Sequence, residues 1–273
     1  TSEHAASMGG SQIWLEVGET MTVDELLRAS VIASANDATV ALAEAVAGRE
    51  ESFVNLMNER AKQLGMKNTT FVNACGLDAD GHLTSGMDVA LMASELIKHD
   101  LIKKYSTVWM DALRNGKSEL VNTNKLVRYY NGATGLKTGT TSKAGCIAAS
   151  AERDGMELVA VVMGSDSSND RFAGAKKLLD YGFANWSFAS ISADLSEYKS
   201  IKVNKGMADS ITPEAPATFN VLLEKGKQDK ITQKISLPTE LDAPVLTGDK
   251  IGTATFMLGD KKLGELPILS ANT

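Results

Sequence analysis

The 273-residue sequence contains only two cysteines, Cys75 and Cys146, has no excess of basic charge and lacks long hydrophobic runs. Two thiols in a chain of this size do not make a disulfide-rich scaffold, and a domain this large does not need a covalent staple, so we expect both to be free. The formal net charge of −6 argues against a general nucleic-acid binder and against a polybasic membrane patch. No run of about 18 apolar residues occurs, so we expect no membrane-spanning helix.

Metal-ligand spacings are also missing. The three histidines, His4, His82 and His99, do not pair with one another or with a cysteine at the spacing of a zinc site. The segment Asp78-Ala79-Asp80-Gly81 begins like a calcium loop, but the third ligand and the closing glutamate are absent. We therefore expect no metal and no cofactor, and we interpret this segment as a structured turn.

Helical patterns dominate the first part of the chain. Thr22-Val23-Asp24-Glu25 is typical of a capping box, and it predicts a helix that is interrupted at Ser34-Ala35-Asn36-Asp37. An alanine-rich helix should follow and end at Gly48. Amphipathic spacing predicts further helices over 51–64 and 88–98, the second continuing in broken form to Lys104.

Alternating patterns replace the helical ones further along. Residues 144–152 and 156–164 flank Arg153-Asp154-Gly155 and predict a tight hairpin, followed by a helix over 170–185. From about Ser192 onward, short alternating runs separated by Gly, Pro and Asp predict an all-β module of about 80 residues. We place the domains at 1–190 and 191–273.

The segment Lys137-Thr138-Gly139-Thr140 has the composition of a peptide-binding strand. An ammonium and hydroxyl groups suit a terminal carboxylate, and a residue without a side chain lets an extended peptide approach the strand and pair with it. Three specified residues also recur by chance in a few per cent of chains of this length, so a surface lysine before a turn is the alternative interpretation.

Ser34-Ala35-Asn36 lies at the predicted helix break, where serine and asparagine also serve as ordinary caps. The functional interpretation places the Ser34 hydroxyl in a proton relay that includes Lys137. Asn36 would then hydrogen-bond a substrate amide or a catalytic lysine.

The order and surroundings of these motifs resemble the low-molecular-mass penicillin-binding proteins, the D-alanyl-D-alanine carboxypeptidases of bacterial cell walls. Residues 26–29 lead into Ser34-Ala35-Asn36-Asp37-Ala38, and Gly135-Leu136-Lys137-Thr138-Gly139 precedes Lys143-Ala144-Gly145-Cys146, with Gly76–His82 between them. The resemblance covers residues 1 to about 190 as a catalytic domain and the remainder as a small β-rich domain. It implies an α/β (α+β) fold in which the helices of a β-lactamase/transpeptidase-like domain pack on an antiparallel sheet.

The resemblance also implies roles for individual residues. Ser34, Asn36 and Lys137 would be catalytic, and Thr138 and Gly139 would line the substrate cleft. The backbone N–H of Thr140 would be one of two oxyanion donors. Arg171, near the start of the last predicted helix of the catalytic domain, would stand behind the cleft and help to bind the substrate carboxylate.

The family's third motif, Ser-x-x-Lys, supplies the nucleophile and should precede the other two. The only such sequence is Ser196-Glu197-Tyr198-Lys199, which follows both motifs and is therefore in the wrong place. The family's spacing puts the motif about 30 residues before Thr1. Since Thr1 is not a methionine, we expect a processed or truncated product that is inactive alone, and that binds its own missing N-terminal fragment.

The expected substrate is a peptidoglycan stem peptide, cleaved through an acyl-enzyme that β-lactams also form, at the bacterial cell envelope outside the cytoplasm. A transpeptidase or endopeptidase remains an alternative within the fold. A β-lactamase is disfavoured because Gly76–Gly86 lacks a Glu-x-x-Leu-Asn run. A non-catalytic wall-binding protein is the alternative from another class, and the missing Ser-x-x-Lys is the argument for it.

Overall fold

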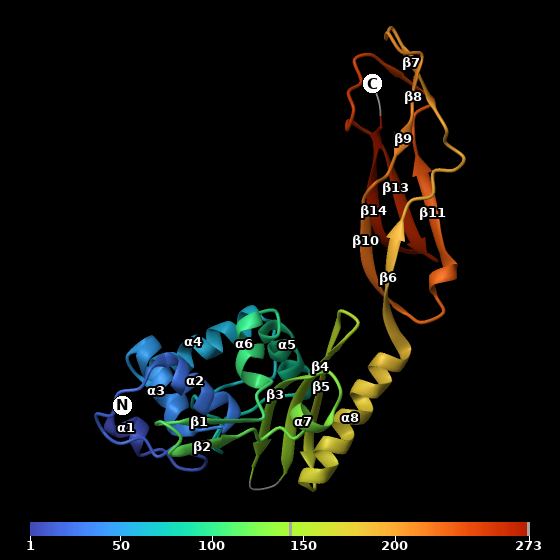
Figure 1. Ribbon diagram of the computed structural model, residues 1–273. Coiled ribbons are helices and arrows are strands. Elements are labelled where there is room, and N and C mark those ends of the chain that lie inside the picture. The colour runs from blue at the N-terminus through green and yellow to red at the C-terminus, as the bar shows by residue number, and fades with distance from the viewer. Residues whose placement is uncertain (142–143, 272–273) are drawn as a thin grey trace. The chain divides into compact units, whose positions relative to one another are not determined.

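The computed structural model describes residues 1–141 and 144–271, which form two compact units, Thr1–Gly182 and Phe183–Thr273 (Figure 1). Lys143, one of the residues in the predicted motif context, lies outside the described residues. The predicted boundary between residues 190 and 191 falls inside strand β6 (Trp186–Ser192), and that boundary stays a prediction.

Helices form one layer of the first unit. They are α1 (Glu3–Ala6), α2 (Val23–Ile32), α3 (Asn36–Ala47), α4 (Glu50–Gln63), α5 (Gly86–Leu96), α6 (Asp100–Ser106), α7 (Leu126–Tyr129) and α8 (Ser168–Asn185). The capping box is confirmed, because Thr22 Oγ1 accepts from the Glu25 N–H at 3.2 Å and Glu25 Oε2 accepts from the Thr22 N–H at 2.9 Å. Gly48 ends α3 with a φ of 80°, a left-handed conformation that glycine adopts without strain.

A three-stranded antiparallel sheet forms the other layer of this unit, in the order β3 (Ala133–Thr140), β4 (Gly145–Arg153), β5 (Met156–Ser165). The predicted hairpin is confirmed: Asp154 and Gly155 both have positive φ, 51° and 74°, as a tight two-residue turn requires. A second hairpin, β1 (Met110–Leu113) with β2 (Ser118–Val121), was not anticipated from the sequence.

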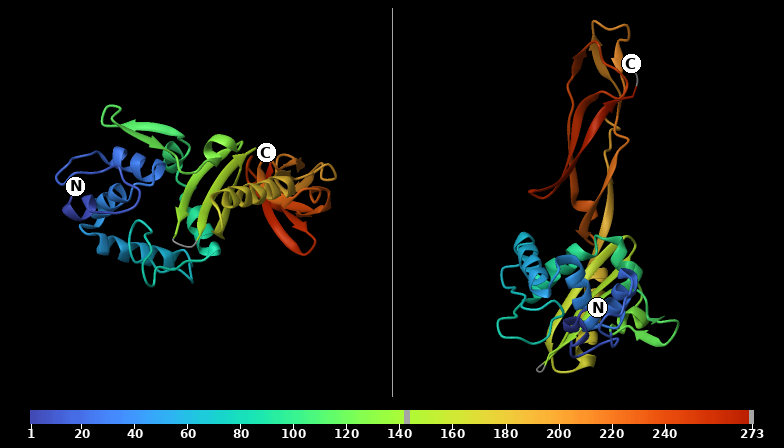
Figure 2. Two further views of the ribbon diagram at one scale, coloured as in Figure 1. Left: turned by 90° about the horizontal axis from the view of Figure 1, so that it is seen from below. Right: turned by 90° about the vertical axis from the view of Figure 1, so that its left-hand side faces the viewer.

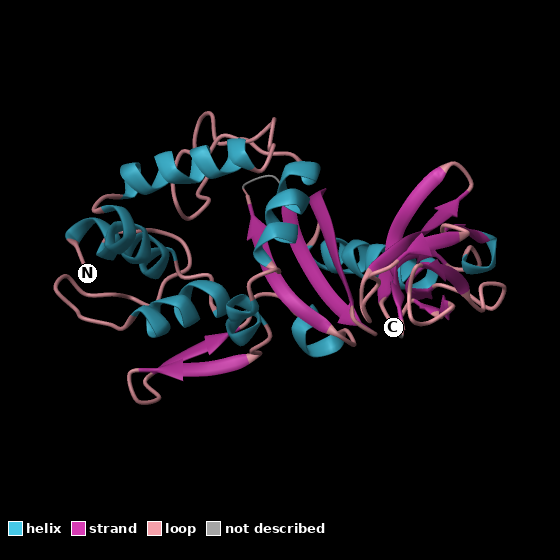
Figure 3. Ribbon diagram, turned by 90° about the horizontal axis from the view of Figure 1, so that it is seen from above, coloured by secondary structure: helices cyan, strands magenta, loops and turns pink. Residues whose placement is uncertain are grey.

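Helices cover both faces of the sheet. Helix α5 lies on one face and α8 on the opposite face, as the views from above and below show (Figures 2 and 3). Two glycines bring α8 close to β5: a Cβ on Gly182 would lie 2.4 Å from Leu158 Cδ1, and one on Gly174 would lie 3.3 Å from Val162 Cγ2. Strand β3 lies at one edge of the sheet, and α6 and α7 pack beside it.

Away from the sheet, an apolar cluster holds the first helices together. Its buried members come from the segment before α2, from α2 itself, from the start of α3 and from the β1–β2 hairpin; they are Ile13, Leu15, Leu26, Ala29, Ile32, Ala35, Ala38, Leu113 and Leu120. This cluster fixes the junction between α2 and α3, where the first motif lies.

The second unit is built of short strands, as the sequence predicted. They are β6, β7 (Ile201–Asn204), β8 (Ser210–Ile211), β9 (Pro213–Glu214), β10 (Thr218–Glu224), β11 (Ile231–Ser236), β12 (Glu240–Asp242), β13 (Lys250–Leu258) and β14 (Lys261–Ser270), with one 3₁₀ turn at Gln228–Lys230. The four-stranded sheet runs β11-β13-β14-β9 and encloses apolar side chains that include Phe256 and Ile268. The predicted fold class, helices on an antiparallel sheet followed by an all-β domain, is confirmed, and both cysteines are free.

Candidate active site

The break between α2 and α3 presents the Ser34 hydroxyl to the edge strand of the sheet. Ser34 has a φ of 62°, which is unusual for a residue with a side chain. The turn is held by the Ala35 N–H, which donates to the Ala29 carbonyl at 3.1 Å, and by the apolar packing around it. In this position Ser34 Oγ accepts a hydrogen bond from Lys137 Nζ at 2.6 Å. Two residues 103 positions apart are thus brought together as the motif interpretation requires.

Lys137 projects from β3, and its ammonium also donates to the Thr138 carbonyl at 2.7 Å. Although the residue as a whole is open to solvent along the edge strand, the surrounding protein desolvates its ammonium. This burial, helped by repulsion from the Arg171 guanidinium, lowers the pKa of Lys137 to about 8. A lysine with such a pKa can give up and accept a proton near neutral pH, which makes it competent for general acid–base chemistry.

Asn36, the first residue of α3, is buried and its amide group is held in place. Its Nδ2 donates to the Gly9 carbonyl at 2.7 Å, and its backbone N–H donates to the Ser11 carbonyl at 2.8 Å. A Cβ on Gly10 would lie 2.7 Å from Asn36 Nδ2, so a glycine is needed where this segment crosses the amide. The side chain is therefore oriented by the segment before α2 rather than by Lys137.

The next residue, Asp37, is fully buried and organises the same region. Its carboxylate accepts from the backbone N–H groups of Ile13 at 3.2 Å, Leu15 at 3.0 Å and Ala38 at 2.8 Å. Sequence reasoning missed this role, because an aspartate next to a helix break is also a common capping residue.

Thr138 and Lys137 are neighbours in β3, so their side chains point to opposite faces of the sheet. Thr138 is buried, and its Oγ1 donates to Thr123 Oγ1 at 2.8 Å, so in this structure the hydroxyl is directed at the segment before α7. Thr123 is a second residue that the sequence did not single out. On the face that carries Lys137, Gly139 stands opposite Cys146, and a Cβ on Gly139 would lie 3.9 Å from Cys146 Cβ.

Arg171 supports the end of the motif strand from behind. It is buried near the start of α8, and one guanidinium nitrogen donates to the Gly139 carbonyl at 2.7 Å and to Thr140 Oγ1 at 3.2 Å. Its Nε is buried without a hydrogen-bond partner among the described residues. The guanidinium thus lies against Gly139 and Thr140 at the end of β3, and the predicted role of Arg171 in binding a substrate carboxylate stays a prediction.

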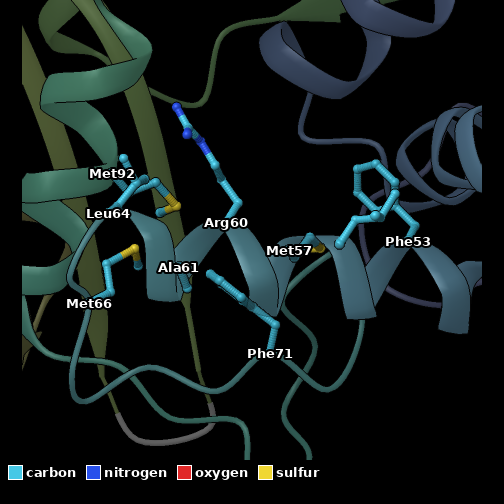
Figure 4. A pocket seen from close by; sticks show the side chains of 9 residues that line it. Phe53, Met57, Arg60, Ala61, Leu64, Met66, Phe71 and Met92 are labelled. Atoms are coloured by element: carbon cyan, nitrogen blue, oxygen red, sulfur yellow. The ribbon is translucent and has the colours of Figure 1, made fainter.

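An apolar pocket of about 310 Å³ lies elsewhere in the first unit, between α4 and α5 (Figure 4). Its walls carry Phe53, Leu56, Met57, Ala61, Leu64, Met66, Phe71 and Met92. The charged group at its rim, Arg60, is paired with Glu95 at 2.7 Å. Because its described lining residues aim no free polar group into it, this pocket offers no site for acyl transfer.

The described residues contain neither a metal-binding cluster nor a membrane-spanning helix. Within 1–141 and 144–271, no group of three or more His, Cys, Asp or Glu side chains is arranged to hold a metal ion. None of the helices in those ranges combines the length and apolarity needed to cross a bilayer.

Comparison with known families gives two matches that together cover most of the chain. Residues 1–167 match the D-alanyl-D-alanine carboxypeptidase family, and residues 190–273 match the C-terminal domain of penicillin-binding protein 5.

Individual relatives agree with these matches. D-alanyl-D-alanine carboxypeptidase DacF of Bacillus subtilis is 41% identical over 273 aligned residues, which are 98% of this chain and 70% of that protein. DacC of Escherichia coli is 33% identical over 97% of this chain and 66% of its own length. Each relative is therefore substantially longer than this chain.

Solved structures show the same relationship. Penicillin binding protein 5 from Haemophilus influenzae superposes with a TM-score of 0.69 at 32% identity, over 96% of this chain and 77% of that one. Penicillin binding protein 6B from Escherichia coli gives a TM-score of 0.72 at 29% identity, over 96% and 74% of the two chains.

Proposed function

Since this chain belongs to the D-alanyl-D-alanine carboxypeptidase family, we propose that it forms most of the active site of a serine-type carboxypeptidase. The reaction removes the terminal D-alanine from peptidoglycan stem peptides through an acyl-enzyme, and β-lactams react at the same site. The observation that carries the proposal is the 2.6 Å hydrogen bond between Lys137 Nζ and Ser34 Oγ, made by a lysine whose pKa is lowered to about 8.

In this mechanism Ser34 and Lys137 form a proton relay. The nucleophilic serine attacks the penultimate D-alanine carbonyl, and the relay delivers a proton to the departing amine. The lowered pKa supports the relay, because Lys137 can then change protonation near neutral pH. Asn36 hydrogen-bonds the substrate amide or the catalytic lysine of the nucleophile motif.

The substrate is proposed to pair with the edge strand β3 as an added strand. Gly139 leaves room for its backbone, and the Thr140 N–H is one oxyanion donor. Thr138 contributes its hydroxyl to the substrate carboxylate after exchanging its bond to Thr123, and the buried charge of Arg171 favours binding of that carboxylate.

The nucleophile itself belongs to a Ser-x-x-Lys segment that we propose lies upstream in the parent protein, at the bacterial cell envelope outside the cytoplasm. Residues 1–273 alone are therefore inactive. They regain activity when joined to that segment or when they bind it as a separate fragment.

Intact-mass spectrometry tests this function directly. The 273-residue chain and a version extended upstream to the start of its gene are each incubated with a penicillin and weighed before and after. The expected result is one acyl adduct on the extended version and none on the shorter chain. With a stem peptide and an acceptor amine both present, a stem peptide shortened by hydrolysis identifies a carboxypeptidase, whereas a product joined to the amine identifies a transpeptidase, because D-alanine leaves in both reactions. An extended version that takes up no adduct would overturn the proposal and favour a wall-binding protein without catalysis.

A further inference from the structure

Two segments flank the Asn36 side chain, and both are attached to one carboxylate. The first is the stretch from α1 to Ser11, which supplies the Gly9 carbonyl to Asn36 Nδ2. The second is the loop Asn73–Leu77, whose last residue approaches the same place: a Cβ on Gly10 would lie 3.6 Å from Leu77 Cδ2. The carboxylate belongs to Glu50, the first residue of α4.

Glu50 bonds to the two segments through different oxygens. Its Oε1 accepts from the Ala74 backbone N–H at 2.8 Å, and its Oε2 lies 2.6 Å from Nε2 of His4 in α1. The side chain is only 13% exposed, compared with 53% for His4, so the carboxylate is largely withdrawn from water and held by its partners. A partly buried carboxylate with two such partners is costly to leave unpaired.

The loop Asn73–Leu77 is closed by hydrogen bonds from its own first side chain. Asn73 Oδ1 accepts from the N–H groups of Gly76 at 2.7 Å and Leu77 at 3.1 Å, and Asn73 Nδ2 donates to the Leu77 carbonyl at 2.8 Å. These bonds close the loop as an Asx-type turn. Fixing Ala74 therefore also fixes Leu77, which stands beside Gly10 and, through it, beside Asn36.

We infer that Glu50 is a positioning residue for catalysis: it clamps the two segments that orient the Asn36 amide in the active site. It touches no reacting atom and acts through Ala74, His4 and the Gly9–Gly10 backbone. The inference rests on the proposed function only in giving Asn36 a catalytic role; the clamp itself is a property of this fold.

Cys75 offers a local probe of the clamp that needs no catalysis. Burial raises the pKa of its thiol, and the nearby negative charge of Glu50 adds to the effect. Loosening the loop exposes the thiol and speeds its alkylation. Peptide mapping by mass spectrometry distinguishes Cys75 from Cys146 without further substitutions.

The test compares Glu50→Ala with Glu50→Gln and with Glu51→Ala. The amide side chain of Glu50→Gln retains an acceptor for the Ala74 N–H. Glu51 is the matched control, because it is also a carboxylate in the first turn of α4 but is 84% exposed, and its ion pair with Arg49 is long at 4.0 Å. In the 273-residue chain, Glu50→Ala should alkylate at Cys75 about fivefold faster at pH 8. In the extended version it should slow penicillin acylation about 10-fold.

Glu50→Gln should restore acylation to within about twofold of the parent, and Glu51→Ala should change neither rate. Equal behaviour of Glu50→Ala and Glu51→Ala in both assays would overturn the clamp. So would slower acylation in Glu50→Ala without faster alkylation of Cys75, or a Glu50→Gln variant as impaired as Glu50→Ala. If the extended version takes up no penicillin at all, the proposed function fails. The clamp is then decided by whether Cys75 is alkylated faster in Glu50→Ala than in Glu50→Gln, because both variants lack the negative charge that raises the pKa of the thiol.

Discussion

The two units of the chain differ in what they bury. Among the described residues, the fully or nearly buried polar side chains of the first unit are Asn36, Asp37, Asp88, Ser106, Asn122, Asn124, Thr138, Ser150 and Arg171, whereas the second unit has Ser270 alone. The core of the second unit is built from apolar side chains on alternating strand positions, such as Leu266 and Ile268.

The first unit therefore depends on hydrogen bonds between buried polar groups, whereas the second unit depends on the packing of apolar side chains. Burying a polar group is unfavourable unless it is hydrogen-bonded, so each buried polar side chain in the first unit must be matched by specific partners. Asp37 with its three backbone donors and Arg171 with the Gly139 carbonyl are examples. The second unit carries no comparable cluster in its described residues, and its sequence needs only the right apolar residues at the right period.

The largest expected difference between the two units is in the rate of penicillin acylation when one lysine in each unit is replaced by alanine. In the extended version, Lys137→Ala should reduce the rate of penicillin acylation about 10³-fold, because it removes a group that transfers a proton in the transition state. Lys202→Ala, in β7 of the second unit, removes an exposed lysine 3.7 Å from Glu240 and should leave the rate unchanged. Adduct formation followed over time by intact mass measures both. A Lys137→Ala rate within about threefold of the parent would contradict the relay.

Substitutions of buried residues should lower the free energy of unfolding of each unit for different reasons. Asp37→Ala leaves three backbone N–H groups buried without an acceptor and should lower the free energy of unfolding of the first unit by about 3–5 kcal/mol. Ile268→Ala should cost the second unit about 3 kcal/mol through a cavity. Hydrogen exchange resolved by peptide assigns each loss to its unit. Only Asp37→Ala should also slow acylation, and an equal slowing by Ile268→Ala would remove the contrast.

The titration of Lys137 gives the first unit a pH dependence that can be measured directly. NMR of labelled lysine side chains, with Lys137→Arg to assign the signal, should give a midpoint near pH 8. Because this pKa lies below the ordinary value of 10.5, the folded state disfavours the ammonium. The unfolded chain then binds more protons between about pH 8 and 10.5, so Lys137 makes the first unit more stable as the pH rises through that window. A midpoint close to the ordinary value would contradict the desolvation of the ammonium.

The smallest expected effect concerns a cap. Thr22→Ala removes the acceptor for the Glu25 N–H at the start of α2 and should cost the first unit about 1 kcal/mol. Lys262→Ala in the second unit breaks an exposed ion pair with Glu265 and should leave stability unchanged within error. Thermal unfolding compares the two variants. If Lys262→Ala lost more stability than Thr22→Ala, exposed ion pairs would contribute to the stability of the second unit, contrary to this expectation.

Local signals predicted much of the fold. The capping box at Thr22, the glycine stop at Gly48 and the Asp154-Gly155 turn each depend on residues within a few positions, so they can be recognised without knowing the rest of the chain. The β1–β2 hairpin was missed although its turn contains Asn115-Gly116, a pair that favours tight turns; the same turn also places Arg114 at positive φ, which arginine rarely adopts. Strand β6 follows α8 directly, and its aromatic residues fit either structure.

The candidate site was predicted only as a set of residue types. The order of the two motifs identified Ser34, Asn36 and Lys137, but nothing in their spacing gives the 2.6 Å contact between Lys137 and Ser34. The roles assigned to these residues and to Arg171 stay predictions until the variants are measured. The bond from Thr138 to Thr123 and the network of Asp37 had no signal in the sequence at all.

The local elements, the change from helices to strands along the chain and the identity of the motif residues could be predicted from the amino-acid sequence, because periodicity, caps and turns act over a few positions. The partner of each buried polar group, in contrast, depends on the packing of elements that are distant in the sequence. Glu50 bonds to His4 and Ala74, 46 and 24 positions away, only because α1, α4 and the Asn73–Leu77 loop pack at one place. Such pairings follow from how elements pack in three dimensions, and a linear pattern does not encode that packing.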